Sequence, residues 1–322
     1  MESNMIDYAA LSYSTKNVGD EIQSIAAMQF LPRVDLFLDR DNLNNVDITK
    51  TTKLILNGWF MGQPKNWPPK SLILPLFISF HLTHKNDSLR TILSSENINY
   101  LRTYQPIGCR DYWTMNALKK HNIDSYFSGC LTLTLKKPNV PKTDKIYFVD
   151  SFVQLNENEA NKIIKTISTT IPERYAENVE IINHWDTKGM SVIEDKFNKA
   201  NKLLSKYASA KLVITSRLHC ALPCLAFGTP VYFVDIGYLT KEDRNRFGGL
   251  YENFDIVQSF GADILQKKYV KKYCGALSIT HKFFSKEIMR QIDWEKSENT
   301  NDRTADIKYN MIRNVENFIN QI

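Results

Sequence analysis

The sequence lacks an apolar run long enough to cross a membrane. Its longest apolar stretch, residues 71–82, is interrupted by Pro75 and His81, and it is far shorter than the roughly 20 residues that a membrane helix needs. Residues 1–10 carry two acidic side chains and no basic cluster ahead of an apolar run, so they do not have the pattern of a secretory signal. We therefore expect a cytoplasmic protein.

Cysteine is scarce and unpaired in its spacing. The number of cysteines is odd and they are widely scattered, which favours reduced intracellular thiols over a disulfide framework. Cys220 and Cys224 have only His219 nearby, which is not the paired spacing of a structural zinc site. We expect buried thiols and neither a metal nor a cofactor. The five cysteines are Cys109, Cys130, Cys220, Cys224 and Cys274.

Positive charge is in only modest excess. The formal net charge is +6, and no basic helix is visible, so nucleic acid is not an expected partner and anionic small molecules are. The densest basic and aromatic segment is residues 266–273. It is either a solvated surface or a peripheral contact with an anionic inner membrane face.

The chain has no internal repeat and no low-complexity segment, and its 322 residues suit two compact domains. Short apolar runs rich in β-branched and aromatic residues alternate with stretches of helical period, a pattern typical of α/β folds with parallel sheets. In the first half, the runs that we interpret as strands are residues 6–11, 34–38, 53–56, 75–80 and 106–109.

A second series follows residues 136–141, whose paired lysines and prolines resemble a linker. We therefore predict two Rossmann-like domains facing a cleft, residues 1–138 and 139–300, and a helix in residues 301–322 that returns to the first domain. The second series consists of strands 145–149, 179–182, 211–215 and 231–234, with helices at 156–170 and 192–207.

Ligands of parallel α/β sheets bind beyond the carboxyl ends of the strands, where helices begin. The first such loop is residues 14–20, in which Gly19 permits a tight turn. Asp20 there is either the cap of the following helix or a base or orienting group in the cleft. The second is residues 108–111, where we expect Arg110 to project outward from the strand end and Asp111 to cap a helix. Arg110 either pairs with Asp111 at the surface or clamps a carboxylate or phosphate.

The third segment, residues 210–230, is the most specific. A buried strand is followed by Ser216 as a helix cap and by an apolar helix over 218–227. Arg217 and His219 are the only ionisable side chains at this helix start, where exposed N–H groups favour a small dianion. The alternative for His219 is a core histidine bonded to a carbonyl. Pro223 predicts either a kink or a later helix start.

Together these motifs resemble the polysaccharide pyruvyltransferase family. They are Asn17-x-Gly19-Asp20, Gly108-x-Arg110-Asp111, and Ser216-Arg217-Leu218-His219 before an apolar helix that ends in Gly-Thr-Pro. The resemblance implies a fold similar to the GT-B glycosyltransferases. It also implies transfer of the pyruvyl group of phosphoenolpyruvate onto a sugar as a ketal, with release of phosphate, in the synthesis of surface or capsule polysaccharide. The acceptor is a sugar, either free or lipid-linked.

The resemblance assigns roles to individual residues. His219 and Asp20 form an acid–base pair, without an assignment of which is which, and Arg110 is a second donor-binding arginine. The chain departs from the family where Asn57 and its neighbours replace a glycine run. The donor-binding residues are Arg217, Leu218, His219 and Arg110, and the acceptor or cleft residues are Asn17, Gly19 and Asn57. His184, Trp185 and Asp186 follow another predicted strand end, where they are either further cleft residues or a solvated loop.

Two other functions share this fold and remain open on sequence grounds, because a fold does not fix the chemistry of its site. One is a nucleotide-sugar glycosyltransferase of the GT-B fold. The other is a non-catalytic carbohydrate-binding protein.

Overall fold

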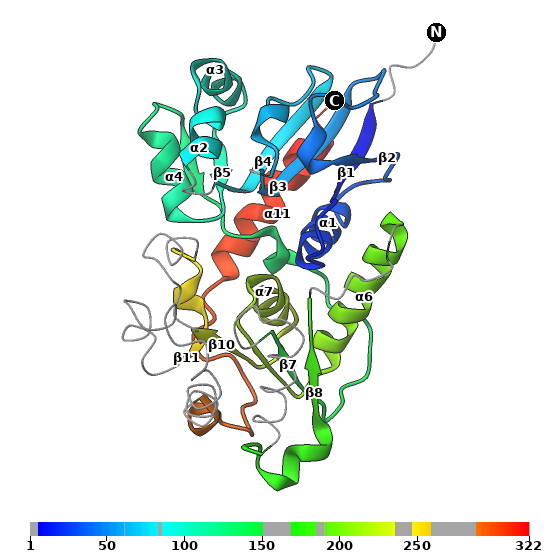
Figure 1. Ribbon diagram of the computed structural model, residues 1–322, viewed down its shortest axis with the longest axis vertical. Helices are drawn as coiled ribbons and strands as arrows, with labels where there is room; N and C mark the ends of the chain where they lie inside the picture. The colour runs from blue at the N-terminus through cyan, green and yellow to red at the C-terminus, as the bar shows by residue number, and fades with distance from the viewer. Residues whose placement is uncertain are drawn as a thin grey trace, which may run out of the picture.

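A computed structural model describes residues 6–60, 62–82, 86–150, 169–184, 190, 192–235, 247–258 and 288–321. It contains a six-stranded sheet of order β2-β1-β3-β4-β5-β6 and a five-stranded sheet of order β11-β10-β9-β7-β8. Figure 1 shows the first sheet above the second. All neighbouring strands run parallel. The predicted architecture of two α/β units, each built on a parallel sheet, is therefore confirmed.

The first sheet forms from short apolar segments whose side chains are largely buried. Its helices are α1 Gly19–Met28, α2 Asn86–Ile92, α3 Ser95–Thr103 and α4 Tyr112–Lys119. The short strand β6 was not predicted, because three residues carry too little periodicity to be recognised. The strands are β1 Asp7–Ser12, β2 Leu36–Asp39, β3 Thr52–Trp59, β4 Ile73–His81, β5 Ile107–Cys109 and β6 Ser125–Phe127.

A β-bulge interrupts the pairing of β3 with β4. Leu56 is opposite Phe77 and Gly58 is opposite Phe80, so β4 contains one extra residue across from Asn57. Bulges of this kind redirect side chains beside functional sites. Here the bulge lies at the carboxyl end of β3, next to the start of α1.

The second sheet is formed by short, buried strands, and the predicted series agrees with it to within about one residue at each end. The four-residue strand β11 was not predicted. The predicted helix at residues 156–170 and the basic segment 266–273 lie outside the described residues. The elements are β7 Ile146–Val149, β8 Val179–Ile182, α6 Ile193–Ser209, β9 Leu212–Thr215, α7 Leu218–Phe227, β10 Val231–Asp235 and β11 Asp255–Gln258.

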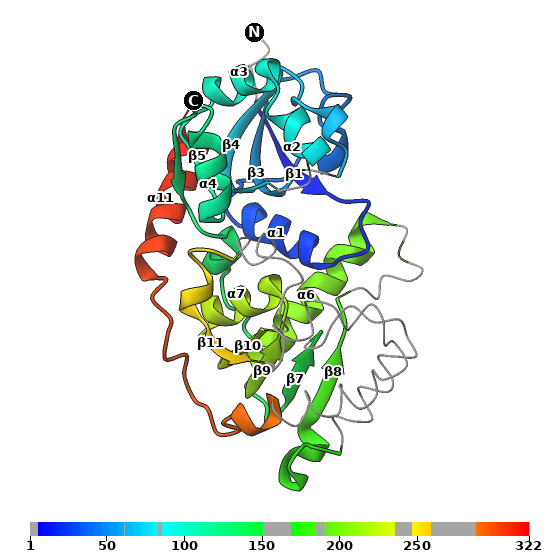
Figure 2. The same ribbon diagram turned by 60° about the vertical axis from the view of Figure 1, so that its left-hand side comes forward.

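Three helices lie between the two sheets, α1 from the first half and α6 and α7 from the second (Figure 2). Their apolar faces share one core, in which Ile22 of α1, Leu204 of α6 and Leu222 of α7 are buried together. The helical period of residues 192–207 predicted this inner face correctly, since Leu203, Leu204 and Tyr207 are all buried in this core. The two sheets are thus joined by a continuous hydrophobic layer rather than by a linker alone.

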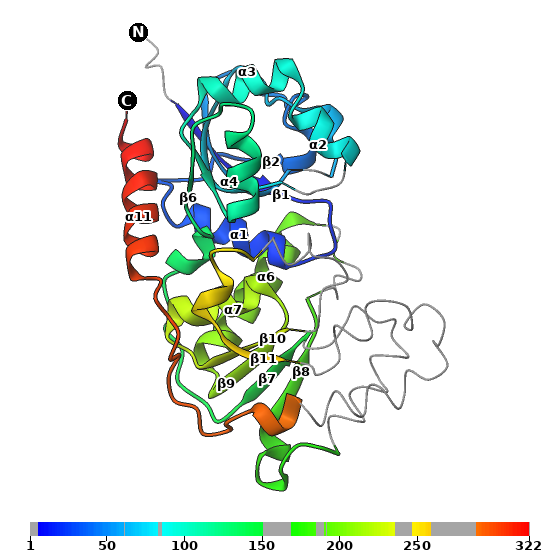
Figure 3. The same cartoon turned by 90° about the vertical axis from the view of Figure 1, so that its left-hand side faces the viewer.

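The last helix, α11 Ala305–Asn320, lies beside the first sheet although it follows the second in sequence (Figure 3). Lys53 of β3 fixes its end: the Lys53 ammonium donates to the carbonyls of Phe318 at 2.8 Å and Ile319 at 3.1 Å, and to that of Gln321. The last carbonyls of a helix have no partner within the helix, so this lysine satisfies them. None of the helices in the described part of the chain is long and apolar enough to span a membrane.

Candidate functional site

Each sheet has one point where the strand order reverses, between β1 and β3 in the first and between β7 and β9 in the second. Ligands of parallel sheets bind at such switch points. The two points are joined by direct contacts. The Val18 N–H donates to the His184 carbonyl at 3.1 Å, and a β-carbon placed on Gly19 would lie 3.3 Å from the Cβ and Nδ1 of His219. A side chain at Gly19 would crowd His219, so glycine favours this close approach.

Asp20 is not the cap of α1, which was one of the two roles considered for it. The cap position is Val18, which makes no side-chain bond, and the Asn17 amide oxygen accepts the Gly19 N–H instead at 3.2 Å. Asp20 lies in the first turn, and its carboxylate accepts hydrogen bonds from the Thr15 hydroxyl at 2.6 Å and the Gln23 amide at 3.2 Å. This leaves the Asp20 side chain directed to the switch point of the first sheet.

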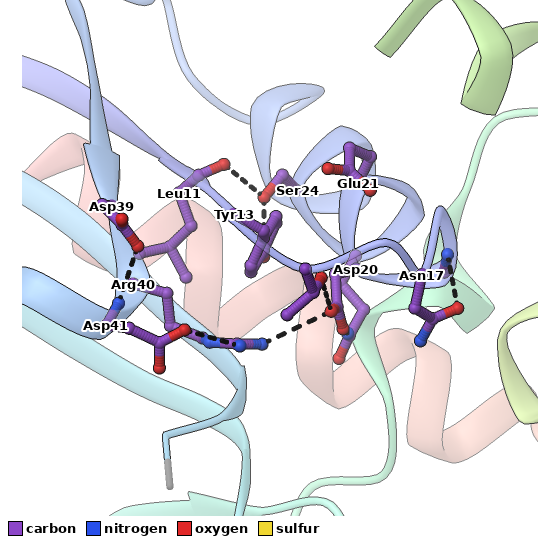
Figure 4. Close-up of polar contacts among 12 residues, drawn as sticks. Leu11, Tyr13, Asn17, Asp20, Glu21, Ser24, Asp39, Arg40 and Asp41 are labelled. Carbon is purple, nitrogen blue, oxygen red and sulfur yellow. Dashed lines mark hydrogen bonds and ion pairs between the residues drawn. The ribbon is translucent and has the colours of Figure 1, made fainter. Parts of the chain in front are cut away.

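Arg40 reaches Asp20 from the end of β2. Its Nη1 lies 3.6 Å from Asp20 Oδ2 and its Nη2 donates to Asp41 at 2.9 Å (Figure 4). The guanidinium lies over the rings of Tyr13 at 4.9 Å and Trp59 at 5.7 Å. Burial opposes the charge, but the carboxylates of Asp20 and Asp41 outweigh it and raise the pKa of Arg40. Arg40 is therefore a permanent buried cation, and no sequence motif identified it as a candidate site residue.

Asn57 joins the same cluster from β3. Its amide donates to the backbone carbonyl of Gln23 at 2.8 Å, and the next residue, Gly58, has a φ of +125°. A β-carbon at Gly58 would be strained by that φ and would lie 3.1 Å from the Gln23 side-chain oxygen. Asn57 is thus held against α1 beside Asp20.

A salt bridge ties this region to α6. The Lys196 ammonium donates to the carbonyls of Tyr13 at 2.8 Å and Thr15 at 2.9 Å, and it lies 3.9 Å from Glu21. Burial, with a smaller contribution from Asp20, raises the pKa of Glu21 from its ordinary 4.5 to about 7. Neither Lys196 nor Glu21 was selected from the sequence, because the two are distant in the chain and lie on helices with many other charges.

Asp150 organises the second switch point. It follows β7 with a φ of +42°, a left-handed conformation that aspartate tolerates better than most residues. Its carboxylate accepts the His184 N–H at 3.0 Å and the Arg217 Nε–H at 3.1 Å, and its carbonyl accepts the Ser216 hydroxyl. The sequence analysis missed Asp150, although an acidic residue directly after a buried strand is a recognisable signal.

Arg217, and not Ser216 as expected, is the cap residue of α7. Its N–H donates to the Thr215 hydroxyl at 2.9 Å, while Ser216 turns back to Asp150. The Arg217 side chain is 23% exposed. The structure therefore presents an oriented guanidinium at the helix start, with part of its surface open to solvent.

His219 lies in the first turn of α7 with φ −80° and ψ 17°, outside helical values. Pro223 explains this kink, because a proline ring clashes with the carbonyl four residues earlier, and that residue is His219. The expectation of a kink is confirmed and the kink lies at the candidate catalytic residue itself. Leu218, beside it, is buried.

His184 contributes its backbone to the junction, while its ring points into the core. Nε2 lies 2.6 Å from the Tyr207 hydroxyl. Burial lowers the pKa of His184 from 6.5 to about 4; Asp150 acts to raise the pKa and Arg217 to lower it further. The ring is therefore neutral at physiological pH. Trp185 and Asp186 lie outside the described residues.

Arg110 does not project outward, because only 3% of the residue is exposed. It follows β5, two strands beyond β3, and its backbone N–H donates to the Phe80 carbonyl at 2.9 Å.

Asp111 caps α4 as predicted, accepting the Thr114 N–H at 2.8 Å, and it binds His81 Nδ1 at 2.6 Å. Burial opposes ionisation of Asp111, but His81 and Arg110 lower its pKa below the ordinary value. His81 was not selected as a site residue from the sequence.

Four cysteines, Cys109, Cys130, Cys220 and Cys224, are buried thiols as predicted, and Cys274 lies outside the described residues. Among the residues that the structure describes, no group of three or more His, Cys, Asp or Glu side chains could hold a metal ion.

Comparisons with known proteins place this geometry in a family. A comparison with curated proteins finds no significant sequence match. One similar solved structure is a functionally uncharacterised protein from Klebsiella pneumoniae, which is 16% identical; the match covers 75% of this chain and 86% of that one, with a TM-score of 0.40. Another is a UDP-N-acetylglucosamine 2-epimerase candidate from Listeria monocytogenes, which is 9% identical; the match covers 98% of this chain and 97% of that one, with a TM-score of 0.47. The model of the polysaccharide pyruvyl transferase family matches residues 17–238, from Asn17 to beyond the end of β10. Since this match spans more than half of the chain and contains the starts of both α1 and α7, the chain belongs to the polysaccharide pyruvyl transferase family.

Proposed function

We propose that the protein transfers the pyruvyl group of phosphoenolpyruvate onto two hydroxyls of a sugar, free or lipid-linked, and releases phosphate. One observation carries the proposal within this family: the start of α1, with Gly19 and Asp20, contacts the start of α7, with Arg217 and His219. An acidic group and an anion-binding group thus meet where the two sheets are joined.

The donor fits the second switch point by charge. Phosphoenolpyruvate carries a phosphate and a carboxylate, and arginine binds either group through two parallel N–H donors. Asp150 holds Arg217 by Nε, which orients the guanidinium before the donor arrives. The positive end of the α7 dipole adds to this attraction. We assign the second anionic group to Arg110, whose guanidinium is already desolvated.

The reaction needs protons moved at defined atoms. A proton is added to the methylene carbon of phosphoenolpyruvate, which makes the neighbouring carbon electrophilic, and a first sugar hydroxyl adds there and loses its proton. Phosphate then leaves with the electron pair of its C–O bond, and a second hydroxyl closes the ketal and loses its proton. The two sugar hydroxyls release two protons. One of them restores the proton that the enzyme gave to the methylene carbon, and the other leaves with phosphate.

Acid and base follow from the surroundings of the two candidates. The Asp20 carboxylate accepts hydrogen bonds from the Thr15 hydroxyl and the Gln23 amide and faces the Arg40 guanidinium, so its two oxygens are held in place as acceptors. We therefore assign Asp20 as the group that takes the hydroxyl proton and His219 as the group that protonates the donor. The negative charges of the bound donor stabilise the imidazolium that His219 needs for this step.

The decisive measurement is release of phosphate from phosphoenolpyruvate in the presence of a panel of sugars, with detection of the ketal methyl group by NMR. Thermal shift separates the alternatives, because a bound donor raises the melting temperature. Stabilisation by nucleotide sugars but not by phosphoenolpyruvate would indicate a glycosyltransferase. Sugar binding without stabilisation by either donor would indicate a carbohydrate-binding protein.

A further inference from the structure

Buried polar atoms without hydrogen-bond partners gather at the first switch point. Among the described residues they include Nε and Nη1 of Arg40, the side-chain oxygen of Gln23 and that of Asn57. All three residues are at least 97% buried. Buried polar groups are rarely left unpaired in native proteins, and each one costs about 1–3 kcal/mol. We call Arg40, Gln23 and Asn57 the Arg40 cluster.

These atoms belong to one place. Asp20 links Arg40, 3.6 Å away, to Gln23, whose amide it accepts at 3.2 Å. Asn57 then donates to the Gln23 backbone at 2.8 Å. The cluster therefore brings the end of β2, the first turns of α1 and the end of β3 together around the candidate base.

Its chemistry suits hydroxyl groups. Arg40 offers two N–H donors, whereas Gln23 and Asn57 offer carbonyl acceptors, and a hydroxyl is the neutral group that can satisfy both kinds. Arg40 already faces two carboxylates, Asp41 at 2.9 Å and Asp20 at 3.6 Å. An anionic ligand would add a third negative charge at short range, which is unfavourable at low dielectric.

We propose that the Arg40 cluster is a subsite for the hydroxyl groups of a neutral sugar, and that Arg40 is its specificity-determining residue. The proposal rests on the proposed function, in which this sugar is the acceptor and Asp20 takes its proton. A neutral polyol is the substrate class, and an acidic sugar that places its carboxylate here is excluded.

The competing explanation is that Arg40 only fastens β2 to α1. The chain supplies a matched control, because Arg33 also lies over a tyrosine ring, Tyr8 at 5.1 Å, and pairs with a neighbouring aspartate, Asp35 at 2.7 Å. Arg33 donates to the Ile6 carbonyl, before the start of β1 and thus away from the switch point.

The experiment measures direct binding of neutral methyl glycosides and their matching uronic acids by ligand-detected NMR, without donor, to wild type, Arg40→Lys, Arg40→Met and Arg33→Lys. Arg40→Lys keeps the charge between Asp20 and Asp41 but loses the fork of donors, so it tests the subsite even where Arg40→Met does not fold. We expect wild type to bind a neutral glycoside about tenfold more tightly than its uronic acid, a difference of about 1.4 kcal/mol. Arg40→Lys should lose about tenfold in this affinity, and Arg33→Lys should lose none.

Equal affinity of wild type and Arg40→Lys would overturn the proposal, as would equal affinity for the uronic acid or no binding of any neutral glycoside. The donor reaction is judged separately. Sugar binding that depends on Arg40, in a protein that releases no phosphate from phosphoenolpyruvate, would keep the subsite and reject the proposed function.

Discussion

The two switch points face each other but are stabilised in different ways. At the second, the protein itself satisfies the functional groups: Asp150 accepts from His184 and Arg217, and Thr215 both accepts from Arg217 and donates to Val149 at 2.7 Å. At the first, donors of Arg40 and acceptors of Gln23 and Asn57 are buried without partners among the described residues. The contacts within the protein thus orient Asp150 and Arg217 at the second switch point, whereas at the first they leave polar atoms of the Arg40 cluster for the proposed ligand.

The two switch points also differ in the charges that surround them. The first switch point has Asp20 and Asp41 around Arg40, with Glu21 opposite Lys196. In the part of the second that the structure describes, Asp150 faces the partly exposed Arg217 at a positive helix end. A preoriented cation at a helix start suits an anionic donor, whereas a site rich in carboxylates suits a neutral acceptor. This difference in charge supports the proposed division between a donor site and an acceptor site.

The largest effect should come from His219→Gln, which tests whether the second switch point acts on the donor or only binds it. Glutamine keeps a polar side chain against Gly19 but cannot deliver a proton, so turnover should fall by about 100-fold or more, as expected for a missing general acid. Steady-state kinetics of phosphate release would show this as a loss in kcat with a smaller rise in the KM for phosphoenolpyruvate. A change confined to KM would mean that His219 only binds.

A pH-dependent stability should come from Glu21 at the first switch point. The raised pKa of Glu21 means that the native state holds the proton more tightly than the unfolded chain. The contribution of protonated Glu21 to the free energy of unfolding is therefore fully present below pH 4.5 and is lost as the pH rises through about 7. Glu21→Gln should match wild type near pH 4.5 and exceed it by up to about 3 kcal/mol above pH 7. Urea unfolding of both proteins across this range measures the difference. A constant difference at all pH values would contradict a raised pKa.

The sequence predicted the order of the main strands and helices and the kink at His219, because these depend on neighbours in the chain. Apolar runs define the strands, and Pro223 acts on the residue four positions before it. The helix face of α6 was also predictable, since its apolar positions repeat at helical spacing. Local patterns therefore sufficed for the architecture.

The errors concern groups whose partners are distant in the chain. Arg110 was expected at the surface, but burial depends on the strands beside it. The sequence left two roles open for Asp20, and the cap role is wrong: Asn17 accepts the Gly19 N–H, whereas Asp20 faces Arg40, twenty residues later. Lys196 reaches Tyr13 across 183 positions. No spacing rule in a single sequence encodes such contacts.

Arg217→Lys should affect the donor more than the acceptor and so sharpen the difference between the switch points. Lysine keeps the charge but cannot make the paired N–H donors or hold the bond from Nε to Asp150. We expect about a tenfold weaker binding of phosphoenolpyruvate, equal to about 1.4 kcal/mol, with unchanged binding of neutral glycosides. Isothermal titration with each ligand measures both. Unchanged donor affinity would remove Arg217 from the donor site.

The smallest effect should come from Asp150→Asn, which tests whether the second switch point is preoriented. Asparagine tolerates the positive φ of this position and still accepts one hydrogen bond, so the fold should persist and the melting temperature should change little. The charge that fixes Arg217 is lost, and because a partly exposed ion pair contributes about 0.2–1 kcal/mol, donor affinity should fall by up to about fivefold. A merely structural Asp150 would change the melting temperature and leave donor affinity intact. Combining Asp150→Asn with Arg217→Lys distinguishes the two cases: if Asp150 acts on the donor only by orienting Arg217, the double variant binds phosphoenolpyruvate no more weakly than Arg217→Lys alone.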